Sequence, residues 1–211
     1  MSTLHPLDQV LQNCVPVAIV PKHGKFEPLD KDGHRYLVAS DGLWLELRTP
    51  WLHLRYPVAQ QDAVPMPYGS LHPLVDFKVE TPSMEFLGRF IQQGISELPN
   101  ETGAWITVKD GQLRFHRLTS IHADQDRLAY ECPVLEEGET LFIDLHTHGK
   151  APAFFSRTDD EDDRNSVKVA ICVGYPKAGE PPQVVARLCA LGLFLELSDL
   201  AWMVGNESNE N

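Results

Sequence analysis

The sequence lacks the long apolar runs of a membrane protein and the leader of a secreted one. A membrane-spanning helix needs about 18 or more consecutive apolar residues, and no stretch of the 211 residues approaches that length. The N-terminus has neither the basic region nor the long apolar region of a signal peptide. We therefore expect a cytoplasmic protein.

Basic residues are also few. The formal net charge is −12, from 18 Lys+Arg against 30 Asp+Glu. Residues 81–211 carry 11 basic and 21 acidic side chains, whereas residues 1–80 carry 7 and 9. Because phosphate binding requires a basic surface, the acidic second part argues against a nucleic-acid partner. A hydrophobic content of 43% with 23% charged residues is typical of a globular protein that buries a core.

Cysteine is scarce and scattered, and no Cys-x-x-Cys pair occurs. The four cysteines are Cys14, Cys132, Cys172 and Cys189. This spacing favours reduced core residues over a disulfide framework or a thiolate zinc site.

Alternating apolar and polar residues dominate residues 1–79, which we interpret as a β-rich N-terminal region of unknown role. Leu43, Leu45 and Leu47 alternate with polar or aromatic neighbours, and a second alternating run follows from residue 51. The pattern predicts a small antiparallel meander with one polar face. We expect His53 to lie exposed on that face, and residues 58–73 to form a linker or surface loop.

The next predicted element is a helix, followed by a series of strands. Met84, Leu87 and Phe90 begin an apolar stripe at helical spacing, with Thr81 or Ser83 as candidate caps and Pro99 after its end. Strands are expected near residues 104–108, 113–121, 128–134, 140–148 and 167–173, with a hairpin in 184–197. Residues 205–211 form a polar tail.

Two histidines end the strand predicted at 140–148. In a strand, side chains alternate between faces, so His146 and His148 point the same way, ~7 Å apart along the backbone. Imidazole nitrogen is a preferred zinc ligand, and Asp159 offers a carboxylate oxygen as a third. Three protein ligands leave the fourth tetrahedral position open for water, which is the catalytic pattern. We therefore predict a Zn²⁺ site formed by His146, His148 and Asp159.

The full run reads His-x-His, seven residues, Ser-x-x-Asp. It resembles the signature of the JAMM zinc metalloproteases, also called JAB or MPN+, which include deubiquitinating enzymes and their prokaryotic relatives. The resemblance covers residues 80–204. It implies an α/β fold, a curved sheet flanked by helices, and a zinc-dependent peptidase or isopeptidase that acts on a ubiquitin-like protein.

The resemblance also implies an upstream glutamate as general base and a serine that donates to the oxyanion. Ser156 occupies the serine position of the motif. Glu101 is the best candidate for the base because it follows a helix, precedes a glycine and opens an apolar run. Glu97 and Glu131 are alternatives, although we interpret the first as a helix surface residue and the second as an exposed residue.

The sequence departs from the family pattern at two places, and only the second affects the expected function. Gly149 stands where the family usually has proline, and the segment after Ser156 leaves little room for the substrate-gripping insertion of eukaryotic members. A non-catalytic MPN-type scaffold that binds a partner is the alternative function. An amidohydrolase barrel needs about 250 residues with His-x-His near its start, and a zinc deaminase needs Pro-Cys-x-x-Cys; neither fits.

Within the family, a β-rich N-terminal part before a short JAMM domain resembles the A proteins of bacterial PRTRC systems. Those cassettes also encode a ThiF-like, E1-like activating enzyme and a ubiquitin-like protein. The resemblance therefore implies these two proteins as partners.

Overall fold

The computed structural model describes residues 4–61, 64–79, 84–123 and 128–197. The chain divides into two compact units, Met1–Lys78 and Val79–Asn211. The proposed caps Thr81 and Ser83 and the polar tail at 205–211 lie outside the described residues. No helix in the described ranges is long and apolar enough to cross a membrane.

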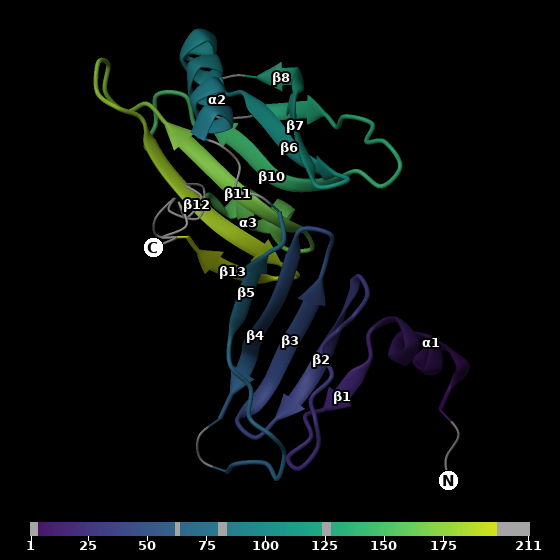
Figure 1. Ribbon diagram of the computed structural model, residues 1–211. Helices are drawn as coiled ribbons and strands as arrows, with labels where there is room; N and C mark the ends of the chain where they lie inside the picture. The colour runs from purple at the N-terminus through teal and green to yellow at the C-terminus, as the bar shows by residue number, and fades with distance from the viewer. Residues whose placement is uncertain (1–3, 62–63, 80–83, 124–127, 198–211) are drawn as a thin grey trace, which may run out of the picture. The chain divides into compact units, whose positions relative to one another are not determined.

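The first unit is a five-stranded sheet in the order β1-β2-β3-β4-β5 (Figure 1). Its strands are β1 (Val17–Ile19), β2 (Gly33–Ala39), β3 (Gly42–Arg48), β4 (Leu52–Gln60) and β5 (Leu74–Phe77). β1 runs parallel to β2 and the other neighbours are antiparallel. The meander expected from the alternating residues is therefore present as β2-β3-β4. A short helix, α1 (Pro6–Cys14), was not predicted, and none of its residues is buried.

The expectation of one polar face and an exposed His53 is wrong. Trp44 and Glu46 on one face of β3 are as buried as Leu45 and Leu47 on the other. A buried carboxylate requires polar partners, and Glu46 has three of them, of which the Leu29 backbone N–H donates to Oε1 at 3.3 Å. Arg35 Nε donates to Glu46 Oε2 at 2.7 Å, and His53 Nε2 lies 3.1 Å from Glu46 Oε1. His53 is buried because it completes this cluster.

The second unit is built on a six-stranded sheet in the order β13-β12-β11-β10-β6-β7. These strands are β6 (Gly103–Lys109), β7 (Gln112–Arg117), β10 (Thr140–Thr147), β11 (Val167–Gly174), β12 (Gln183–Ala190) and β13 (Leu193–Glu196). Only the β10–β11 pair is parallel among the described neighbours of this sheet. β8 (Thr119–Ala123) and β9 (Leu128–Glu131) form a separate two-stranded sheet. The strand predicted at 113–121 is therefore two strands, β7 and β8.

Two helices, α2 (Met84–Glu97) and α3 (Arg157–Asp163), cover opposite faces of this sheet (Figure 1). Tyr175 Oη donates to the Ile91 carbonyl of α2 at 2.9 Å, and an added Cβ on Gly94 would lie 3.0 Å from Thr147 Cγ2. On the other side, Lys168 Nζ lies 2.7 Å from Asp163 Oδ1 of α3. Since side chains alternate along a strand, Thr147 and the histidines on either side of it face different helices. The expected α/β class, a sheet flanked by helices after a β-rich region, is confirmed.

Candidate metal centre

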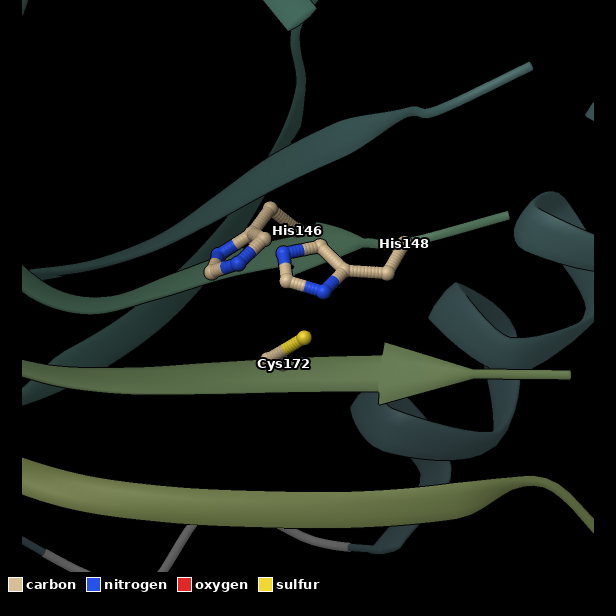
Figure 2. A group of neighbouring side chains, drawn as sticks. All are labelled: His146, His148 and Cys172. Carbon is tan, nitrogen blue, oxygen red and sulfur yellow. The ribbon is translucent and has the colours of Figure 1, made fainter. Parts of the chain in front are cut away.

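The end of β10 places His146 and His148 on the face that α3 covers. Their ring centroids lie 5.1 Å apart, and Figure 2 shows both imidazoles projecting from the same strand. Pairing continues past the end of the strand, because the His148 backbone N–H donates to the Val173 carbonyl at 2.9 Å. The backbone that carries both histidines is therefore held in extended form by β11.

Asp159 is brought to the histidines by the first turn of α3. Ser156 is the N-cap: its Oγ accepts from the Asp159 backbone N–H at 3.2 Å, and Asp159 Oδ2 accepts from the Ser156 N–H at 2.6 Å. This reciprocal capping box satisfies two helix-end donors. It also fixes the carboxylate so that Oδ1 lies 3.6 Å from His146 Nε2, and Oδ2 lies 3.8 Å from His148 Nε2.

These separations fit a shared metal ion better than direct hydrogen bonds. They exceed the 2.7–3.2 Å of an N–H···O bond, whereas nitrogen and oxygen ligands of one tetrahedral zinc lie about 3.4 Å apart, given bonds of about 2.0–2.2 Å. His146 Nε2 is a buried atom without a hydrogen-bond partner. Since a buried polar atom without a partner costs free energy, this nitrogen is suited to bind a cation.

The surroundings of the second histidine disfavour its protonated form. Burial and then the neighbouring His146 lower the pKa of His148, so this imidazole favours the neutral form that binds metals.

Aromatic rings border the pair. The Phe154 ring meets His148 edge-on with centroids 4.6 Å apart, and the Phe155 ring meets His146 at 6.2 Å. Phe155 itself packs under Arg187, whose guanidinium carbon lies 4.0 Å from the ring centroid. The segment between the His-x-His pair and Ser156 therefore forms an apolar border of the candidate site.

α3 is anchored by a buried ion network. Lys168 Nζ contacts Asp144 Oδ2 at 2.5 Å and Asp163 Oδ1 at 2.7 Å, and Arg187 Nη2 contacts Asp163 Oδ2 at 2.8 Å. Despite its burial, the pKa of Lys168 is raised because two carboxylates face the ammonium group. Asp160, the residue after the proposed ligand, also accepts from Arg187. The acidic run at 159–163 is therefore partly internal.

The backbone at Glu101 is held close to the histidines because the next residue, Thr102, is hydrogen-bonded to Thr147. The Thr102 N–H donates to Thr147 Oγ1 and its carbonyl accepts from the Thr147 N–H, both at 2.9 Å. Gln93 of α2 adds a bond from Nε2 to Thr102 Oγ1 at 2.7 Å. The Glu101 carboxylate is also near enough to contribute to the raised pKa of Cys172. The two alternative glutamates have other surroundings: Glu97 pairs with Arg117, and Glu131 is exposed on β9.

Sequence reasoning missed Cys172, which lies beside the histidines and is fully buried (Figure 2). The nearest ligand atoms of His146, His148 and Cys172 all lie within 4.8 Å of one another. Burial, opposed by a Phe154 backbone hydrogen bond and assisted by Asp159 and Glu101, raises the pKa of Cys172 to about 12. The sequence did place Cys172 in the strand predicted at 167–173, but no spacing rule relates a cysteine there to a distant His-x-His. Cys14 and Cys132 are exposed, so the expectation of four core cysteines is right only for Cys172 and Cys189.

Comparison with known families agrees with this architecture. Residues 84–188 match the family described as prokaryotic homologs of the JAB domain. The second unit carries a JAB-family domain. Residues 5–78 match a domain of unknown function, DUF2016. No curated protein matches the chain.

Among solved structures, the chain is similar to the solution structure of protein DSY2949 from Desulfitobacterium hafniense. The sequence identity is 14% and the TM-score is 0.43, over 55% of this chain and 88% of that one.

Proposed function

We propose that the JAB-family domain is a zinc-dependent peptidase or isopeptidase that cleaves after the C-terminal tail of a ubiquitin-like protein. The observation that carries this proposal is the arrangement of His146, His148 and Asp159, whose imidazole nitrogens and carboxylate oxygens face one another at 3.6 and 3.8 Å. Zinc held there supplies a Lewis acid for the scissile carbonyl and lowers the pKa of a bound water toward 7.

The remaining chemistry falls to the side chains around the ligands. Glu101 accepts the proton of the attacking water and passes it to the leaving amine, a role that typically contributes a factor of about 10²–10⁴. Ser156 uses its Oγ lone pair to cap α3, and a hydroxyl can also donate its proton. Donation to the oxyanion of the tetrahedral intermediate would contribute ~3 kcal/mol.

A narrower assignment follows from the order of the two regions. A β-rich first unit before a short JAB-family domain is the plan of the A proteins of PRTRC systems, so the substrate would be the ubiquitin-like protein of such a cassette. A ThiF-like, E1-like enzyme would be the second partner. The extended tail of the substrate would add to a sheet edge through main-chain hydrogen bonds.

The test separates proton transfer from metal binding. Glu101→Gln should retain zinc, because the base does not ligate the metal, and should lower the rate of hydrolysis by about a hundredfold or more. The readouts are zinc content and cleavage of a ubiquitin-like fusion by each variant. Asp159→Ala should instead lose zinc, because it removes one of three ligands.

Glu97→Gln is the matched control, because Glu97 pairs with Arg117 and should not affect turnover. A Glu101→Gln protein that cleaves as fast as the parent would assign the base elsewhere, with Glu97 and Glu131 next in line.

The second candidate function is a non-catalytic scaffold, and the position of Cys172 favours it. A thiolate ligand added to the three proposed ones would complete a closed coordination sphere, which is the structural pattern of zinc. A zinc-loaded parent that cleaves no fusion, including one made from any ubiquitin-like protein encoded beside it, would support the scaffold.

A further inference from the structure

The strand pairing places Cys172 next to His146. In the parallel β10–β11 pair the Cα of His146 is in register with the Cα of Cys172. Residues aligned in this way share a face of the sheet, on strands about 4.7–4.9 Å apart. The Cys172 sulfur is directed toward the two imidazole rings (Figure 2). The thiol and both histidines thus offer ligand atoms within 4.8 Å of one another.

We propose that Cys172 is a fourth ligand of the metal held by His146, His148 and Asp159. The inference rests on the metal site of the proposed function, but it does not depend on hydrolysis. Asp159 reaches the histidines from α3 and Cys172 from β11, so the two ligands come from separate elements. When Sγ binds the metal, the thiol proton is released to solvent.

A purely structural role for Cys172 is tested by comparison with Cys189, the other buried cysteine. The Cys189 sulfur lies 3.5 Å from Asp163 Oδ2, a carboxylate that already pairs with Lys168 and Arg187. Cys172 faces two metal-binding side chains instead, and one of them, His146, has a buried Nε2 without a hydrogen-bond partner. The surroundings of Cys172 therefore suit a cation, whereas those of Cys189 already contain two.

Thiolate ligation changes what the site does. Four protein ligands complete a tetrahedral zinc site, so a water can bind only when Cys172 dissociates from the metal. Sulfur also biases the site toward Zn²⁺ and away from Mg²⁺, Ca²⁺ and Mn²⁺, which prefer oxygen ligands. The resting protein would then hold zinc in a closed state, ready for opening by a substrate or partner.

The experiment replaces zinc with cobalt in the full-length protein and records its absorption spectrum. The parent should show an intense sulfur-to-cobalt charge-transfer band in the near ultraviolet at one cobalt per chain. Cys172→Ser and Cys172→Ala should lose the band and bind zinc at least tenfold more weakly in chelator competition, by comparison with the 10–100-fold cost of losing even an outer-shell partner. Cys189→Ser is the buried-cysteine control and should retain the band.

X-ray absorption of the zinc-loaded parent keeps the proposal testable if the Cys172 variants do not fold. A sulfur neighbour at about 2.3 Å is expected beside nitrogen and oxygen neighbours at about 2.0–2.2 Å. One bound metal with nitrogen and oxygen neighbours alone would overturn thiolate ligation and leave the proposed function standing. A folded parent that binds no metal would overturn both.

Discussion

At the scale of single residues, Asp159 has two tasks, and Ser156 connects them. One carboxylate oxygen closes the capping box on the Ser156 N–H, while the other faces His146. The cap therefore determines where the third proposed ligand lies, and we expect Ser156 to affect metal binding without contacting the metal.

Ser156→Ala should reveal this positioning role. Loss of an N-cap hydroxyl destabilises a helix by about 1 kcal/mol, and the less restrained Asp159 should weaken zinc binding by about tenfold, the low end for an outer-shell partner. Chemical unfolding and chelator competition measure the two effects. Ser156→Thr keeps a capping hydroxyl and should restore both. Unchanged zinc affinity in Ser156→Ala would contradict the coupling.

At the scale of elements, the packing of α2 against the sheet depends on one glycine. A Cβ on Gly94 would lie 2.3 Å from Tyr175 Oη and 3.0 Å from Thr147 Cγ2, beside the strand end that carries both histidines. Gly88 on the same helix is exposed, and a Cβ there would meet nothing within 4 Å. Alanine substitutions at the two positions thus distinguish the effect of helix propensity on stability from the effect of close packing.

Gly94→Ala should lower the free energy of unfolding by about 1–3 kcal/mol, the usual cost of overpacking. Gly88→Ala should raise it by up to about 1 kcal/mol, because alanine favours a helix over glycine. Thermal unfolding of the two variants beside the parent makes the comparison. If Gly94→Ala is also more stable than the parent, α2 is not seated on β10 as described.

Most strands and helices were predictable from the local sequence pattern. The predictions that were wrong concerned residues whose environment depends on contacts across a sheet. Alternation identified β3 and β4, but it placed His53 in solvent because the burial of Glu46 depends on Arg35 from another strand. The strand that carries the His-x-His run was predicted from the sequence, whereas the position of Cys172 beside the histidines depends on the β10–β11 register. α1 was not predicted from the sequence. None of its residues is buried, so it lacks the core-facing apolar stripe that identified α2.

At the scale of the whole molecule, the chain divides into two compact units. A protein lacking residues 1–78 should therefore fold and bind one zinc per chain, because every proposed ligand lies in Val79–Asn211. Circular dichroism and metal analysis of the truncated protein test this. Failure to fold would mean that the two units depend on one another for stability.

The central claim is that the end of β10 carries a metal site, and zinc analysis of purified protein tests it most directly. We expect about one zinc per chain in the parent and none in the His146→Ala/His148→Ala double variant, which should remain folded by circular dichroism. His146 is half-buried and His148 is buried, but neither is one of the apolar side chains that form the core. A folded double variant that retains the zinc of the parent would contradict the account.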